Sequence, residues 1–279
     1  MSSTSCRISM KIAKLRIRNF RDEVWRYWKK HGRRKLAWRK TRNPYRILVS
    51  EVMLQQTQVL RVITKYKEFL KEFPTVQKLA RAPLGSVLKV WSGMGYNRRA
   101  KYLRDAAGII VGKHKGRVPK DEAVLRALPG VGPYTARAVR VFAFNEPDVL
   151  IETNIRAAFI HLFYPSVLQN TGIEDSKILL IAAAAAEGQN PREWHWALMD
   201  YGVHIKKLHK NPARKSAHYT KQSKFEGSLR QVRGAILKSI LKDIPHIDLR
   251  GRYGKKYEAA LTSLSKDGLI LKKKGLWKV

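Results

Sequence analysis

Cysteine is nearly absent from this sequence: Cys6 is the only one among 279 residues. A single cysteine cannot form an intrachain disulfide, and it cannot supply the several thiolates of a zinc or iron–sulfur site. Four of the eight histidines lie between residues 195 and 218 without cysteines or nearby acids, namely His195, His204, His209 and His218. We interpret them as facing phosphate or solvent rather than forming a substitute metal site. The sequence therefore predicts no metal site and no cofactor.

Acidic residues are also scarce, because 21 Asp and Glu stand against 57 Lys and Arg, for a formal net charge of +36. A folded protein tolerates such an excess only at a cost in self-repulsion, so a polyanionic partner is expected, and nucleic acid is the leading choice. A membrane surface is the second choice, but no apolar run approaches the roughly 20 residues of a spanning helix. Residues 1–20 lack the features of a signal peptide. We expect an intracellular monomer located with DNA, in the cytoplasm or nucleoid of a prokaryote.

Alternating strand patterns are rare, whereas apolar residues at spacings of three and four recur along most of the chain. Glycines and prolines divide this pattern into short helices joined by tight turns. The fold class predicted from this pattern is all-α.

The C-terminal part of the sequence differs from the rest. Residues 206–224 contain no acid and few apolar residues, which indicates a basic linker or loop. Residues 225–279 then show a helical segment, a second helical segment and two short apolar runs around Gly275, which predicts a β-hairpin. This order resembles a winged-helix module, an architecture often used on DNA. A small domain that only packs against the rest is the alternative.

One carboxylate occupies an unusual position, in the stretch "SEVMLQQTQVL". Glu51 shares a predicted helix face with the apolar residues Ile47, Leu48 and Leu54. Burial there would raise its pKa, as a general acid requires. The alternative is a boundary acid that pairs with a nearby arginine or lysine.

The string "LRALPGVGPYTARAV" predicts a tight turn between two helices. Gly130 and Gly132 permit the turn and allow backbone N–H groups to approach a phosphate, while Val131 can enter the core. Pro133 suits the first position of the next helix. Such a helix-hairpin-helix would bind the DNA backbone without reading sequence, although an ordinary turn between helices is the alternative.

Four strings, "PYRILVSEVMLQQTQV", "WSGMGYNRRAKYLRDAA", "LPGVGPYTARAV" and "LIETNIRAAF", occur in the order and approximate spacing of the helix-hairpin-helix base-excision glycosylases. The first string resembles the MutY-type adenine DNA glycosylases, and the resemblance covers about residues 25–205. It implies a six-helix barrel lobe with the helix-hairpin-helix at 38–148 and a second helical lobe at 149–205. It also implies that N-terminal helices within 1–37 pack with the second lobe.

The resemblance implies roles for particular residues. Glu51 would protonate the adenine leaving group. Leu54, Gln55 and Gln56 match residues that wedge into the duplex and contact the opposite strand after base flipping. Tyr96 matches an aromatic that stacks beside the orphaned base, although a core tyrosine is equally consistent with the sequence. The helix-hairpin-helix would bind DNA through Gly130, Val131, Gly132 and Thr135.

Tyr134 stands where the related glycosylase-lyases carry a nucleophilic lysine, so water should be the final nucleophile and the enzyme should be monofunctional. Glu152 stands where the family normally has an aspartate that stabilises the sugar cation. Asn154 follows it, and both are expected in the catalytic site. A helix-start glutamate is the alternative for Glu152. The family's four cluster cysteines and its additional domain for 8-oxoguanine are also missing.

These observations predict a monofunctional DNA glycosylase that removes adenine mispaired with 8-oxoguanine or guanine from double-stranded DNA. Two alternatives remain open. One is a thymine or uracil glycosylase acting on mismatches with guanine, and the other is a protein that binds lesions without turnover.

Overall fold

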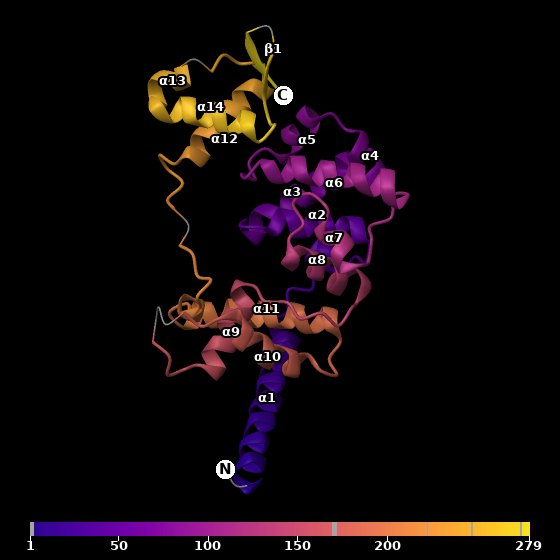
Figure 1. Ribbon diagram of the computed structural model, residues 1–279, viewed down its shortest axis with the longest axis vertical. Coiled ribbons are helices and arrows are strands. Elements are labelled where there is room, and N and C mark those ends of the chain that lie inside the picture. Colours follow the sequence, from indigo (N-terminus) through magenta and orange to yellow (C-terminus); the bar gives the residue numbers. More distant parts are fainter. Residues whose placement is uncertain (1–2, 169–171, 222, 247, 274) are drawn as a thin grey trace. The chain divides into compact units, whose positions relative to one another are not determined.

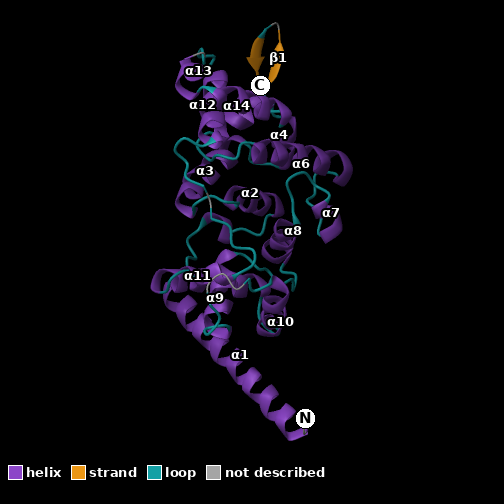
Figure 2. Ribbon diagram, turned by 60° about the vertical axis from the view of Figure 1, so that its left-hand side comes forward, coloured by secondary structure: helices purple, strands orange, loops and turns teal. Residues whose placement is uncertain are grey.

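The computed structural model describes residues 3–168, 172–221, 223–246, 248–273 and 275–279. Within these ranges the chain is mainly helical, and its paired strands are confined to one short hairpin, coloured orange in Figure 2. The predicted all-α class is confirmed. The chain divides into two compact units, with unit 1 comprising residues 1–42 and 137–221 and unit 2 comprising residues 43–136 and 222–279. Among the described helices, none has the length and apolar character needed to cross a membrane.

Unit 1 is a helical assembly in which α9, α10 and α11 gather around the C-terminal part of α1, as Figure 1 shows. The core centres on Phe20 of α1, whose ring lies 4.9 Å from that of Phe159 and 6.2 Å from that of Trp194. The elements of this unit are α1 (Ser3–His31), η1 (Ala37–Arg39), the π-helical turn η2 (Arg140–Phe144), α9 (Thr153–Phe163), α10 (Asp175–Ala186), α11 (Pro191–Leu208) and η3 (Pro212–Lys215).

A buried carboxylate ties the N-terminal segment of unit 1 to α11. The side chain of Asp200 is 2% exposed and forms ion pairs with Arg33 at 2.5 Å and Arg39 at 2.7 Å. Burial alone would raise the pKa of Asp200, but the hydrogen bonds and charges of Arg39 and Arg33 hold that pKa below its usual value. The ionised carboxylate therefore depends on both guanidinium groups.

The segment predicted as a basic linker, 206–224, differs from that prediction over most of its length. Lys206 begins the last turn of α11, and η3 buries Pro212 and Ala213. Ser216 then forms a parallel β-bridge with Ile173. This basic segment therefore packs in unit 1 as far as Ser216, whereas residues 217–221 of the same unit are exposed.

The first part of unit 2 surrounds α2 with short helices. Tyr45 of α2 donates a hydrogen bond of 2.7 Å to the carbonyl of Phe73, and Phe69 lies edge-on to Trp91 with 5.9 Å between ring centroids. The elements are α2 (Pro44–Leu54), α3 (Val59–Glu72), α4 (Val76–Arg81), α5 (Leu84–Trp91), α6 (Arg98–His114), α7 (Glu122–Arg126) and the start of α8 (Pro133–Val139).

Residues 225–279 form the C-terminal module of unit 2, with α12 (Leu229–Leu241), α13 (Asp248–Tyr253), α14 (Lys255–Lys266), β1 (Leu271–Lys273) and β2 (Leu276–Lys278). The strands pair in antiparallel register, as expected from the apolar runs around Gly275. The sequence indicated only two helices before the hairpin. It missed α13 because this six-residue helix has no buried residue, so apolar periodicity could not reveal it.

The Asp200 cluster generates a prediction about stability. We expect Asp200→Asn to lower the free energy of unfolding of unit 1 by about 3–5 kcal/mol, because it leaves two guanidinium groups without their buried anion. Denaturant unfolding followed by tryptophan fluorescence measures this change. Since the pKa of Asp200 is lowered by folding, the stabilisation is present above its unfolded pKa and disappears as the pH falls through the folded value.

Glu68→Gln is the control for Asp200→Asn. Glu68 is about half-exposed and pairs with Lys65 on the surface of α3, so its loss should cost about 0–1 kcal/mol. A similar small cost for both variants would show that the Asp200 cluster does not hold unit 1 together.

Candidate active site

Glu51 lies one turn from the end of α2 and is only 6% exposed. The helix begins after Asn43, whose side chain accepts a hydrogen bond from the Arg46 amide. Every residue from Ile47 to Met53 is buried, so this part of α2 is covered on all faces. Burial raises the pKa of nearby Tyr66 to about 12, against the effect of Arg46, and the Glu51 charge adds to that rise.

Arg99 of α6 closes the C-terminal end of α2. The last carbonyls of a helix lack partners within the helix, and the Arg99 guanidinium satisfies them while remaining beside the loop that precedes α6. Burial lowers the pKa of Arg99 to about 10, so the group stays charged at neutral pH. Its two terminal nitrogens donate to the carbonyls of Val52, Met53, Gln55, Met94 and Gly95 and to the hydroxyl of Thr57, at 2.6–3.3 Å.

The turn after α2 carries the three residues predicted to enter DNA. Leu54 and Gln55 are partly exposed, Gln56 is exposed, and the backbone of Gln56 has a φ of 51°. Tyr96, in the loop before α6, has a φ of 48° and is partly exposed. A positive φ is unusual for residues other than glycine, and at both positions the backbone adjoins a segment that Arg99 holds.

The predicted hairpin is present between α7 and α8. Gly130 has a φ of 75°, and a Cβ added there would lie 2.8 Å from the Cβ of Tyr102, so this position requires glycine. Val131 is buried, as expected, whereas Gly132 is exposed. Thr135 is also buried, and its hydroxyl accepts a hydrogen bond of 3.1 Å from Gln55. Thr135 therefore positions Gln55, a role that its sequence context did not indicate.

Tyr134 lies in the first turn of α8 and is partly exposed.

Glu152 and Asn154 belong to unit 1, at the start of α9. Glu152 is the N-cap, and its two carboxylate oxygens accept hydrogen bonds from the Ile155 amide at 3.0 Å and from the Asn154 side chain at 3.1 Å. Lys206 of α11 donates to the Asn154 side-chain oxygen at 3.2 Å. Burial raises the pKa of Glu152, while these hydrogen bonds and the Lys206 charge oppose the rise. Glu152 thus caps α9 and also belongs to a polar network with Asn154 and Lys206.

Two residues on α11, His195 and Gly202, contact the backbone on either side of Glu152. His195 is buried and accepts a hydrogen bond of 3.1 Å from the Leu150 amide. Burial lowers the pKa of His195 to about 4, so the ring is neutral at physiological pH. A Cβ at Gly202 would lie 1.9 Å from the carbonyl oxygen of Asn154, so only glycine allows α9 and α11 to approach this closely.

The four histidines predicted to face phosphate or solvent are separately engaged in unit 1, and that prediction is wrong for His195, which is buried. His195 supports Leu150, His204 stacks on Tyr27 at 4.5 Å, His209 stacks on His161 at 4.1 Å, and His218 lies 3.5 Å from Glu174. Within the described residues, no group of three metal-ligating side chains exists.

The glycosylases that this sequence resembles commonly carry an iron–sulfur cluster held by four cysteines. The residues of this chain do not fit such a cluster, because the sequence has only one cysteine. Backbone and lysine contacts close this end of unit 1. The amide of Ile173 donates to the Lys215 carbonyl at 2.8 Å, and the Lys215 ammonium donates to the Pro165 carbonyl at 2.8 Å.

Residues 49–181 match the family described as HhH-GPD superfamily base excision DNA repair protein. The matching part of the chain includes Glu51, the hairpin and Glu152.

Among curated proteins, the chain is similar to adenine DNA glycosylases. It is 38% identical over 155 residues to that of Buchnera aphidicola subsp. Baizongia pistaciae, covering 56% of this chain and 44% of the relative. It is 42% identical over 130 residues to that of Mycobacterium tuberculosis strain H37Rv, covering 46% and 43%. The chain thus spans less than half the length of these two relatives. A solved thermostable thymine-DNA glycosylase is 26% identical with a TM-score of 0.59, covering 67% of this chain and 86% of that structure.

The sequence did not identify Arg99 as a residue that holds the end of α2 near Glu51, or Lys206 as a residue of the Glu152 network. A signal for Arg99 existed, because it shares a helix face with the buried Leu103 and Ala106 and faces the interior despite its charge. Lys206 gave no comparable signal, because it lies in a run of basic residues and its partner Asn154 is 52 residues away.

The Arg99 contacts predict a local loss of order on a conservative substitution. Arg99→Lys keeps the charge but cannot reach acceptors on both the α2 terminus and the preceding loop, because one ammonium replaces a planar fork. We expect the Thr57 amide, which donates to the Leu54 carbonyl, to exchange its hydrogen at least about tenfold faster. Hydrogen exchange read by NMR or mass spectrometry measures this.

Arg104→Lys, on the same helix but partly exposed beside Asp105, is the matched control and should leave that exchange rate unchanged. Equal rates in both variants would show that Arg99 does not hold the turn.

Proposed function

We propose that this protein is a monofunctional DNA glycosylase that removes adenine mispaired with 8-oxoguanine or guanine. The observation that carries the proposal is the burial of Glu51 one turn before an ordered, partly exposed turn. A carboxylic acid removed from solvent next to a surface that can enter a duplex is what protonation of a flipped base requires. The similarity to adenine DNA glycosylases over this segment supports the choice of adenine.

In this proposal Glu51 donates a proton to the departing adenine. The base then leaves as a neutral molecule while positive charge develops on the sugar. General acid catalysis of this kind contributes roughly a hundred- to ten-thousandfold to a rate.

The turn after α2 fills the space that the flipped base leaves. Leu54 and Gln56 are accessible enough to enter the duplex, and Tyr96 would stack beside the orphaned base. The Gln55 side chain donates a hydrogen bond to Thr135, so Gln55 can contact the opposite DNA strand only if it shares this hydrogen bond with the DNA or gives it up. Gly130, Val131 and Gly132 would place the hairpin backbone against a phosphate.

Glu152 supplies negative charge to the sugar cation, with Asn154 and Lys206 orienting and tuning it. Tyr134 has no amine that could form a Schiff base, so water completes the reaction and the product is an abasic site without strand cleavage. The partner is double-stranded DNA, to which the net charge of +36 attracts a protein monomer, and the chemistry uses no metal or cluster.

A second candidate is removal of thymine or uracil mispaired with guanine. The thymine-DNA glycosylase structure, which covers two thirds of this chain at 26% identity, favours it. The two candidates differ in the excised base, so a direct assay separates them.

The test incubates labelled duplexes containing A opposite 8-oxoguanine, A opposite G, T opposite G or U opposite G, followed by alkali cleavage of abasic sites. We expect release of adenine from the first two duplexes. Release of thymine or uracil alone would establish the second candidate. Binding of any duplex without release would make the protein a lesion binder.

Glu51→Gln is the mechanistic control within that assay. The amide keeps the shape of the side chain but cannot donate the proton, so single-turnover release should fall about a hundred- to ten-thousandfold while duplex binding persists. A rate within a few-fold of the unaltered protein would remove Glu51 from the mechanism.

The Lys206 contact predicts a shift in pH dependence. Glu152 acts as an anion, so activity should be lost as the pH falls through its raised pKa. Lys206→Met removes a charge that lowers this pKa, so the acidic limb of the single-turnover pH profile should move to higher pH. Lys207→Met removes an equal charge from an exposed neighbour and serves as the control. Coincident profiles for the two variants would contradict the role of Lys206.

A further inference from the structure

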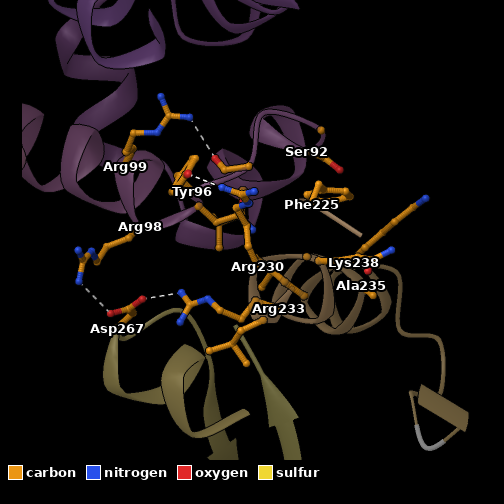
Figure 3. A pocket seen from close by; sticks show the side chains of 18 of the residues that line it. Ser92, Tyr96, Arg98, Arg99, Phe225, Arg230, Arg233, Ala235, Lys238 and Asp267 are labelled. Atoms are coloured by element: carbon orange, nitrogen blue, oxygen red, sulfur yellow. Dashed lines mark hydrogen bonds and ion pairs between the residues drawn. The ribbon is translucent and has the colours of Figure 1, made fainter. Parts of the chain in front are cut away.

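A concavity of unit 2 lies between the C-terminal module and the segments around Gln56 and Tyr96, and it has a volume of about 1370 Å³. One ion pair links the module to the segment beside it, because Asp267 of the module lies 3.3 Å from Arg98 of α6. Within the module, Arg233 of α12 holds Asp267 at 2.5 Å, as Figure 3 shows. The groove therefore joins the turn proposed to enter DNA to a module that has no assigned role.

Arg230 of α12 lies between two aromatic rings in this groove. Its guanidinium carbon is 5.3 Å from the centroid of Tyr96 and 5.7 Å from that of Phe225, an arrangement visible in Figure 3. It donates to the Tyr96 hydroxyl at 2.5 Å and to the Ser223 carbonyl at 3.2 Å. An arginine has five N–H donors, so further donors remain for a ligand. Phe225 is 58% exposed, which makes its ring available for stacking.

The charge of the groove selects the kind of ligand. Lys238 and Arg252 also line it and form no ion pair with an acid among the described residues, whereas its one acidic side chain, Asp267, is already paired twice. Cations arranged around exposed aromatic rings are the combination that binds unpaired nucleic acid, with phosphates on the cations and bases on the rings.

We propose that this groove holds the nucleotide left unpaired opposite the flipped base, and that Arg230 selects a guanine-type base there. Guanidinium groups only donate hydrogen bonds, and guanine presents an acceptor edge with O6, whereas adenine presents a donor at the equivalent atom. Tyr96 and Phe225 supply stacking surfaces, and Lys238 and Arg252 take the flanking phosphates. The inference rests on the proposed function, because base flipping creates the unpaired nucleotide.

The test measures equilibrium binding without chemistry. The probes are duplexes with a tetrahydrofuran abasic analogue opposite G, 8-oxoguanine or A, so no base can be released. We expect the full chain to bind the G and 8-oxoguanine probes about fivefold to a hundredfold more tightly than the A probe. Arg230→Met should reduce this preference to within about twofold.

Two further variants test whether Arg230 recognises the base, or whether it only adds positive charge or only anchors the module. Arg250→Met removes the same charge from an exposed residue of the same module, which pairs with Glu258 and does not line the groove, so the preference should persist. Tyr96→Phe removes the acceptor of Arg230 but keeps the ring. A loss of preference in Tyr96→Phe as complete as in Arg230→Met would mean that the pair only anchors the module, and the proposal would be wrong.

The outcome is independent of the glycosylase assay. If adenine is released but Arg230→Met keeps the full preference, the groove proposal fails and the enzyme assignment stands. If no duplex loses a base but the preference exists and depends on Arg230, the site stands and the catalytic proposal fails. Absence of any preference in the unaltered protein overturns the groove proposal directly.

Discussion

The hydrogen bonds of Arg99 are the interaction on which the candidate site in unit 2 depends. A short helix buried on all faces must end inside the unit, where its last carbonyls would otherwise lack partners. A single guanidinium meets those carbonyls and also the loop that carries Tyr96. The position of Glu51, the turn after α2 and the Tyr96 loop therefore follow from one buried charge. This is why an arginine, with its planar set of donors, is required where a lysine would leave acceptors unmet.

Unit 1 relies on the opposite arrangement, in which the carboxylates of Asp200 and Glu152 are held by basic side chains. Asp200 takes two arginines and links the N-terminal segment to α11, while Glu152 is held by the start of α9 and, through Asn154, by Lys206. Both networks use α11, so the helix that stabilises unit 1 also tunes the candidate catalytic carboxylate. A substitution on α11 therefore affects stability and chemistry together, which is why matched controls on neighbouring residues are needed.

The basic segment after α11 packs through backbone and lysine contacts. Lys215 donates to the Pro165 carbonyl, Ser216 pairs with Ile173 in a short β-bridge, and Ala213 is buried, so packing of ordinary side chains and backbone closes this end of unit 1. The C-terminal module is in contact with the rest of unit 2, because Arg230 binds Tyr96 in the loop before α6 and Asp267 pairs with Arg98 at the start of α6. Basic residues that look interchangeable in the sequence thus have two roles. Some, such as Arg99 and Lys206, connect distant segments of the chain, and others, such as Lys238 and Arg252, line the groove.

The sequence by itself determined the all-α class, the hairpin at Gly130 and the terminal β-hairpin, because these depend on local spacing and on glycine conformation. It also pointed to Glu51 as a buried acid, since an acid among apolar residues on one helix is a local anomaly. Only the tertiary structure showed which basic residues connect distant segments of the chain. Arg99, Lys206 and Arg230 meet partners between 42 and 134 residues away in the chain, and a hydrogen bond between distant segments leaves no periodic trace in the sequence.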